Sequence, residues 1–311
     1  MALSARVLRD AARSKRRRRW VGAGLRMAAP LISARPPPRK PIFILGSPRS
    51  GTTMLFRLLN QSSDVASLDA EGHLLWEMFH HDRGMEWSFH EVGRDSITGR
   101  ERRVLFWAID RLTQGRRYLD KDPANCFRIN YLDALFPDAR FVFLKRDGRA
   151  TVSSLLTAWR SDTGTFPGKR LPIPLSIEGY VGTKWRFVVP PGWEAYAKGR
   201  SLEEVCAFQW TSCMNAILSA RGGIEGERWI EVSYEQMVEA PREEAARLLS
   251  ALELPPDPQV EIFADSLDTH LAKALSRPEP EKWRKENPQE VTRALPLIEP
   301  VMRRLGEPPS Q

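Results

Sequence analysis

A short segment bounded by glycines, Gly46–Thr53 with the sequence GSPRSGTT, has residue types suited to holding a phosphate-like anion. Glycines let the backbone curl so that several N–H groups point at one anion, and a following helix adds its positive N-terminal end. Phosphate loops of nucleoside triphosphatases have a lysine after the second glycine, where this chain has Thr52. The cation is instead Arg49, inside the segment. A glycine-containing turn that binds nothing is the alternative, and the full PRSGTT run makes it the weaker one.

A second pair of residues, Arg146 and Ser154, could hold another phosphate. Arg146 follows the apolar run 141–144 and would stand at a strand end. Ser154 lies eight residues later, about two helical turns on, and faces the same way. A guanidinium and a hydroxyl could then share one phosphate. Ser153 is adjacent and could be mistaken for this residue, and a strand-end Arg beside an ordinary helix Ser is the structural alternative.

These residues require strands that each end in a loop and a helix. Apolar runs predict buried strands at 42–45, 140–144 and 228–232. Helices are predicted at 54–59, 72–80, 127–136, 147–159, 202–221, 241–252 and 291–305. This order predicts an α/β fold with a central parallel sheet flanked by helices. Residues 161–200 are rich in Gly, Pro and aromatic side chains and are predicted to form a long acceptor-site loop.

The excess positive charge of the chain lies at its N-terminus. The formal net charge is +8, but residues 1–40 carry twelve Lys and Arg and one Asp, so the remainder sums to −3. A nearly neutral body argues against specific nucleic-acid binding. A proline-rich run at 35–41 suggests a linker. Residues 1–40 are therefore predicted to be a flexible basic tail with weak contact to anionic membranes as an alternative to a solvated arm, and residues 41–311 a single domain.

Cysteine and histidine usage adds two expectations. Cys126, Cys206 and Cys213 form no CxxC pair, which favours free thiols and a cytoplasmic location. The histidines lack the spacing of metal ligands, so no metal site is predicted. No apolar stretch is long enough to span a bilayer, which leaves peripheral membrane contact through the tail. Nothing in the sequence indicates an oligomeric state.

The two anion motifs, in this order, resemble those of the sulfotransferase superfamily. The family's 5′-phosphosulfate loop, P-[KR]-[ST]-G-T-[TS], is matched by Pro48–Thr53, and its R-x7-S pair for the 3′-phosphate by Arg146 and Ser154 rather than Ser153. Arg in place of Lys at position 49 resembles the branch of tyrosylprotein sulfotransferases and many bacterial enzymes. The resemblance implies the phosphate-loop-like sulfotransferase fold, with 3′-phosphoadenosine 5′-phosphosulfate as co-substrate and no metal. The donor-binding residues that it implies are Arg49, Ser50, Gly51, Thr52, Thr53, Arg146, Ser154 and Tyr234.

Three further segments resemble the family more weakly. The sequence LDKDP at 119–123 is similar to a segment that places a lysine, here Lys121, at the transferring sulfate. Residues 231–238 resemble a strand-to-helix segment that would place Tyr234 at the nucleotide, although a lone aromatic is as often a core residue. Lys282-Trp-Arg284 resembles the K-W segment of bacterial and Golgi members.

Sulfuryl transfer should proceed like phosphoryl transfer, through positioning and charge stabilisation. The resemblance implies Arg49 and Lys121 as the catalytic cations. The acceptor hydroxyl needs a base, and the tyrosylprotein branch uses a Glu shortly after its first helix, matched here by Glu71. His73 and Asp69 are alternatives for the base, and Glu71 could instead only cap the next helix.

The predicted function is transfer of a sulfuryl group to a hydroxyl acceptor, which could be a carbohydrate, phenol, lipid or peptide tyrosine. The aromatic residues of 161–200 suit a lid over such an acceptor, or a small hydrophobic subdomain. A nucleotide or small-molecule kinase with a phosphate loop is one alternative function. A non-catalytic nucleotide-binding scaffold with the tail as its working part is another.

Overall fold

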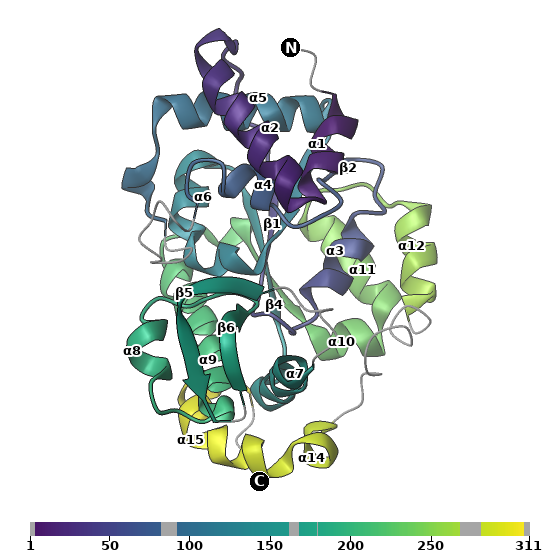
Figure 1. Ribbon diagram of the computed structural model, residues 1–311. Helices are drawn as coiled ribbons and strands as arrows, with labels where there is room; N and C mark the ends of the chain where they lie inside the picture. Colours follow the sequence, from purple (N-terminus) through teal and green to yellow (C-terminus); the bar gives the residue numbers. More distant parts are fainter. Residues whose placement is uncertain (1–3, 82–91, 162–167, 179, 268–280, 308–311) are drawn as a thin grey trace.

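A five-stranded parallel sheet forms the centre of the molecule, with the strand order β2-β3-β1-β4-β7 (Figure 1). The computed structural model describes residues 4–81, 92–161, 168–178, 180–267 and 281–307. The strands are β1 (Ile42–Leu45), β2 (Val65–Ala66), β3 (Arg117–Lys121), β4 (Arg140–Lys145) and β7 (Trp229–Ser233). The parallel α/β fold that the sequence predicts is confirmed.

The sheet is buried on both faces because alternate strand residues enter two separate cores. Phe43, Phe141 and Phe143 pack into one core, whereas Ile44 and Val142 pack into the other. The first core includes residues of α5 (Gly99–Thr113), α6 (Ile129–Leu135), α7 (Gly148–Arg160), α9 (Leu202–Arg221) and α15 (Pro288–Arg304). The second includes residues of α3 (Thr52–Leu59), α10 (Tyr234–Glu239), α11 (Pro241–Ala251) and α12 (Pro258–Asp265). A short α14 (Trp283–Glu286) precedes α15.

The predicted helix at 72–80 is shorter than expected. It is α4 (His73–Trp76), and turns follow it. After the helix, the carbonyl oxygen of Met78 accepts a hydrogen bond from the Arg26 guanidinium of the N-terminal segment. This contact joins residues 52 positions apart, so the periodicity of the segment does not reveal it.

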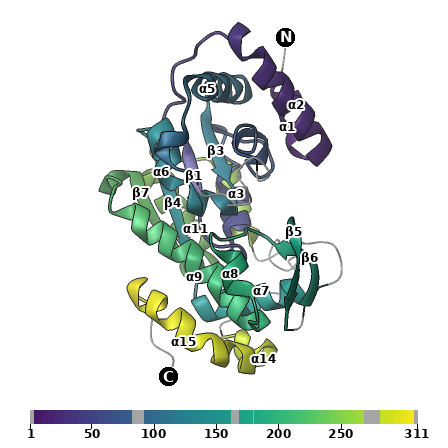
Figure 2. The same ribbon diagram turned by 60° about the vertical axis from the view of Figure 1, so that its left-hand side comes forward.

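The N-terminal segment differs from the flexible tail that was expected. It forms α1 (Ala5–Ala12) and α2 (Lys15–Ala28), followed by a 3₁₀ turn at Ala29–Leu31 (Figures 1 and 2). Leu8 and Leu25 are fully buried in the first core. Arg100 of α5 donates a hydrogen bond of 2.5 Å to the carbonyl oxygen of Arg26. A few apolar residues at helical spacing thus fix a strongly basic segment on the body.

The region predicted as a long loop also contains regular structure. It includes an antiparallel pair, β5 (Gly168–Ile177) and β6 (Tyr180–Arg186), and a short α8 (Trp193–Ala197). Trp185 of β6 is buried edge-on against Trp159 of α7, with ring centroids 5.4 Å apart. Phe166 lies outside the described residues. In the part of the chain that is described, no helix combines the length and hydrophobicity that crossing a membrane requires.

Candidate active site

The loop between β1 and α3 has the backbone geometry of an anion cradle. Arg49 and Gly51 have φ angles of 71° and 102°, which turn the chain sharply into the helix. The Ser50 hydroxyl donates to the Ser47 carbonyl oxygen at 2.7 Å, so its side chain stiffens the loop. Helical bonding begins with the Met54 amide, which donates to Gly51 at 2.9 Å. The amides that precede Met54 open the helix and are oriented to bind an anion.

Tyr234 closes one side of this loop. A Cβ atom on Gly51 would lie 2.5 Å from Cδ2 of the Tyr234 ring, so only glycine fits at this position. The Arg146 guanidinium carbon lies 4.3 Å from the centroid of the same ring, a cation–π contact. The β1–α3 loop, the end of β4 and the start of α10 therefore meet at one aromatic ring.

The two anion motifs are joined by direct hydrogen bonds. Arg49 Nε donates to Ser154 Oγ at 3.2 Å, and Arg146 Nη1 donates to the Arg49 carbonyl oxygen at 2.7 Å. Burial and the neighbouring Arg146 lower the pKa of Arg49. Ser153 turns away and accepts a hydrogen bond of 2.9 Å from Asn287. The structure thus brings Arg49, Arg146 and Ser154 together and leaves Ser153 in a packing role.

The remaining loop residues take different positions. Thr52 is buried at the first turn of α3, whereas the side chain of Thr53 is exposed. Both lie at the open end of the helix, where the first backbone amides have no partner within the helix.

Glu71 lies at the centre of a chain of charged groups on the other side of the site. Its Oε1 accepts a hydrogen bond of 2.7 Å from Lys121 Nζ at the end of β3. Its Oε2 lies 3.0 Å from His73 Nε2, and His73 Nδ1 lies 2.9 Å from Asp122 Oδ2. Glu77 is 3.7 Å from the same imidazole and accepts from Lys169 of β5 at 2.5 Å. The carboxylate is thus held between an ammonium group and an imidazole.

The surrounding charges set the protonation states of this chain of groups. Burial opposes the charged form of Glu71, but Lys121 and His73 lower its pKa to about 2. Burial likewise opposes the imidazolium, but Asp122 and Glu71 raise the pKa of His73 to about 10. Around neutral pH, Glu71 is a carboxylate and His73 is a cation. Of the two groups, only Glu71 is then in the deprotonated form that a base requires.

Glu71 and Lys121 are supported by a close-packed joint, which is formed by Gly72, Trp76 and Asp120. Trp76 Nε1 donates to Asp120 Oδ2 at 2.9 Å, and Asn125 Nδ2 donates to the same oxygen at 2.7 Å. A Cβ atom on Gly72 would lie 2.3 Å from Asp120 Oδ1 and 2.2 Å from Trp76 Nε1. The chain positions adjacent to Glu71 and Lys121 are therefore in direct contact, which fixes the distance between the two functional groups.

The alternative base Asp69 has other partners. Its carboxylate lies 3.3 Å from Arg9 and 3.7 Å from Arg13, both close to α1, and accepts from Ser67. The sequence did not reveal the roles of Asp122, Glu77 and Lys169. Asp122 lies in the LDKDP segment and could have been found there, whereas Lys169 is distant in sequence and carries no signal. Within the described ranges, no group of three or more His, Cys, Asp or Glu side chains could hold a metal ion.

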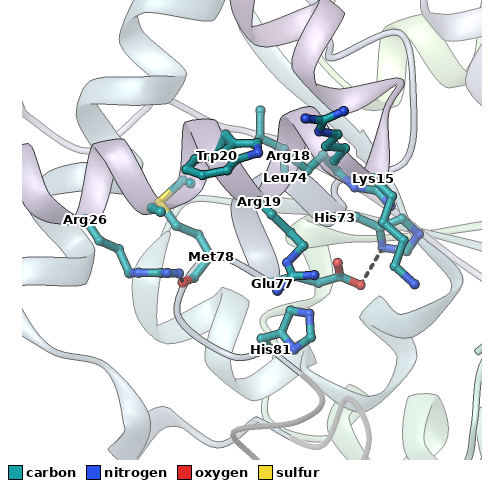
Figure 3. A pocket seen from close by; sticks show the side chains of 13 residues that line it. Lys15, Arg18, Arg19, Trp20, Arg26, His73, Leu74, Glu77, Met78 and His81 are labelled. Carbon is teal, nitrogen blue, oxygen red and sulfur yellow. Dashed lines mark hydrogen bonds and ion pairs between the residues drawn. The ribbon is translucent and has the colours of Figure 1, made fainter. Parts of the chain in front are cut away.

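A cavity of about 770 Å³ lies beside His73 and Glu77, between α2 and α4 (Figure 3). The helix α2 forms one wall of this cavity and contributes most of its basic side chains. The basic residues are Lys15, Arg16, Arg18, Arg19 and Arg26, and Trp20 of the same helix also lines the cavity. The segment expected to be a separate tail is therefore one wall of the space next to the candidate base.

The chain is similar to several known proteins. Residues 41–172, which include Arg49, Glu71, Lys121, Arg146 and Ser154, match the Sulfotransferase family. The chain is 23% identical over 290 residues to protein-tyrosine sulfotransferase A of Caenorhabditis elegans, covering 86% of this chain and 67% of the relative. It is 26% identical over 295 residues to protein-tyrosine sulfotransferase 1 of Danio rerio, covering 86% and 72%.

A solved structure shares the fold. Sulfotransferase STF9 from Mycobacterium avium superimposes with a TM-score of 0.62 at 18% identity, covering 97% of this chain and 86% of that one. The family match and the two protein-tyrosine sulfotransferase relatives support placing the chain in the sulfotransferase superfamily, and the solved structure shows that it shares the fold.

Proposed function

We propose that this enzyme transfers a sulfuryl group from 3′-phosphoadenosine 5′-phosphosulfate to a hydroxyl acceptor. The observation that carries the proposal is the hydrogen bond between Arg49 and Ser154, which joins two anion-binding motifs 105 residues apart. A donor with a phosphate at each end of its nucleoside needs two such sites. The Tyr234 ring packs directly against Gly51 of the loop, which supports Tyr234 as a wall of the nucleotide site.

The proposed donor contacts follow from this arrangement. The amides at the start of α3 and Arg49 would hold the 5′-phosphosulfate, with Thr52 and Thr53 supplying backbone groups. Arg146 and Ser154 would hold the 3′-phosphate through a charge-assisted hydrogen bond and a neutral one. Tyr234 would line the nucleotide. The bound donor supplies the sulfuryl group, and its 5′-phosphate is the leaving group.

Glu71 is the proposed general base, and its lowered pKa has a mechanistic consequence. Lys121 and His73 hold it as a carboxylate but also weaken it as a base. Because Lys121 would interact with the negative donor, its effect on Glu71 would decrease and the pKa of the carboxylate would rise. Glu71 would then accept the proton of the acceptor hydroxyl, and Arg49 and Lys121 would stabilise the charge that develops.

The acceptor remains one of four chemical classes: carbohydrate, phenol, lipid or peptide tyrosine. The two relatives named as protein-tyrosine sulfotransferases support a phenolic acceptor. The three free, buried cysteines support the proposed cytoplasmic location. Incubation with radiolabelled donor and a panel of acceptors from the four classes will identify the acceptor.

Ligand binding provides the direct test of the donor. Calorimetry is expected to show tighter binding of 3′,5′-adenosine bisphosphate without Mg²⁺ than of ATP with Mg²⁺, since Thr52 replaces the lysine that serves β- and γ-phosphates. Tighter, Mg²⁺-dependent binding of ATP would support a kinase instead. Binding of neither nucleotide would support a non-catalytic role.

A further inference from the structure

The outer side of α2 carries large apolar side chains in an unusual setting. Trp20, Met27 and Leu31 are 71%, 81% and 89% exposed. In α-helical geometry, the spacing of seven residues places Trp20 and Met27 on one side of α2, and Leu31 ends the 3₁₀ turn that continues the helix. Solitary exposed apolar residues are ordinary, but three on one helix and the turn that continues it form a surface that water solvates poorly.

Basic side chains surround this apolar line. Lys15, Arg16, Arg17 and Arg19 are all exposed. Among the residues that the structure describes, none of these four forms an ion pair; the one acid of the segment, Asp10, lies 4.0 Å from Arg6 and Arg13. The positive charge of this face is therefore not neutralised by the protein itself.

The helix that carries this face is fixed to the body. Leu25 and Gly22 are buried on its opposite side, and Arg26 bonds to the Met78 carbonyl oxygen. A Trp, two further apolar side chains and a cluster of Lys and Arg on one fixed helix are typical of helices that lie in the interface of a membrane. An acidic peptide would use the charges but would not require the exposed line of Trp20, Met27 and Leu31.

From this arrangement we infer that residues 15–31 bind the surface of an anionic membrane. The apolar line enters the headgroup region, and the arginines contact lipid phosphates. Arg16, Arg19 and Trp20 also line the cavity beside His73, so the mouth of the cavity would lie at the membrane surface (Figure 3). Membrane binding itself does not depend on the proposed transfer reaction.

Sedimentation of the full-length protein with vesicles tests the inference. We expect binding to mixed phosphatidylcholine–phosphatidylglycerol vesicles and little binding to phosphatidylcholine alone. The variant Arg16→Gln/Arg17→Gln should lower the partition coefficient by about 10- to 30-fold, since each basic residue near such a surface contributes about 1 kcal/mol. Trp20→Ala should lower it by roughly tenfold, the effect of removing one large buried apolar side chain.

Matched variants at other places control for general charge and hydrophobicity. Arg303→Gln/Arg304→Gln removes two charges from α15, at the opposite end of the molecule (Figure 1). Ile262→Ala removes an exposed apolar side chain from α12. Neither should change vesicle binding by more than about twofold, within the usual range of surface substitutions. Thermal unfolding of all four variants verifies that each is folded.

Three results would overturn the inference. The first is equal binding to vesicles with and without phosphatidylglycerol. The second is a loss in the α15 variant as large as in the Arg16/Arg17 variant. The third is vesicle binding that Trp20→Ala leaves unchanged while polyglutamate displaces it; that result would assign the face to an acidic polypeptide.

Discussion

The proposed donor half and the proposed acceptor half of the site are built in different ways. In the donor half, Arg49, Arg146 and Tyr234 follow strand ends of one sheet, and close packing at Gly51 sets their positions. In the acceptor half, Glu71 is held by charges from β3, α4 and, through Glu77, β5. The difference predicts that shape determines donor binding, whereas electrostatics determines the protonation state of the proposed base Glu71. Substitutions in the donor half should therefore lower nucleotide affinity, whereas substitution of the base should lower kcat.

The largest expected effect comes from the base. Glu71→Gln keeps the shape of the side chain and removes its basicity, so kcat should fall by about 10²–10⁴-fold. The KM for the donor should change little because Glu71 lies on the acceptor side. Steady-state kinetics with the identified acceptor measures both. Near-normal kcat across neutral pH would show that the base is elsewhere, and His73 and Asp69 would be examined next.

The next effect concerns binding rather than turnover. Arg146→Ala removes a charge-assisted hydrogen bond of about 1.5–3 kcal/mol and should weaken binding of 3′,5′-adenosine bisphosphate by roughly tenfold to a hundredfold. Ser154→Ala should cost less, because its hydroxyl is neutral. Calorimetry measures both affinities.

The neighbouring serine provides the control for the donor half. Ser153→Ala alters a side chain bonded to Asn287 and should leave nucleotide affinity unchanged. If Ser153→Ala weakens binding as much as Ser154→Ala, the assignment of the 3′-phosphate site is incorrect.

Gly51→Ala tests the role of shape directly. The added methyl group would collide with Tyr234, and the alanine would have to adopt the φ of 102° that Gly51 has. The free energy of unfolding should therefore fall by at least about 1–2 kcal/mol. Gly24→Ala in α2 is the matched control. In the described part of the molecule, no neighbouring atom lies within 4 Å of the Cβ atom that alanine would add there, and the substitution should stabilise the protein by about 0.4–1 kcal/mol. Denaturant unfolding distinguishes the two, and equal effects would refute the close-packing argument.

A separate expected effect is the pH dependence of stability due to His73. Its pKa rises from an ordinary value of 6.5 to about 10 on folding. The stabilisation is therefore complete below about pH 6.5 and is lost as the pH rises toward 10. Relative to His73→Gln, wild-type unfolding free energy should decline over this range by at least about 1.4 kcal/mol, equivalent to one pKa unit. Denaturant melts across this range test it, and a constant difference would show that His73 is neutral.

The sequence predicted the donor half better than the acceptor half, for physical reasons. The strands β1, β4 and β7 are apolar runs, and the donor motifs follow β1 and β4 in fixed short spacings. Strand β3, with the sequence RYLDK, was not predicted because its polar residues are buried through hydrogen bonds formed only in the fold, such as Trp76 to Asp120. The Glu77–Lys169 pair joins segments 92 residues apart. Local patterns cannot encode contacts of that range.

The N-terminal helices illustrate the same limit. Twelve basic residues in the first forty suggest a solvated arm, yet six buried apolar residues, among them Leu8 and Leu25, attach the segment to the core. The net charge of the segment does not reveal the few apolar side chains that attach it to the core.

The joint of Gly72, Trp76 and Asp120 has a consequence for how such enzymes diversify. It fixes the proposed base Glu71 relative to Lys121, whereas α2 lines the cavity beside His73 and Lys169 of β5 reaches the site through Glu77. The contacts that set the Glu71–Lys121 spacing are therefore separate from the walls formed by α2 and β5. A chimera that replaces residues 4–31 with the corresponding segment of another member should retain the spacing between Glu71 and Lys121.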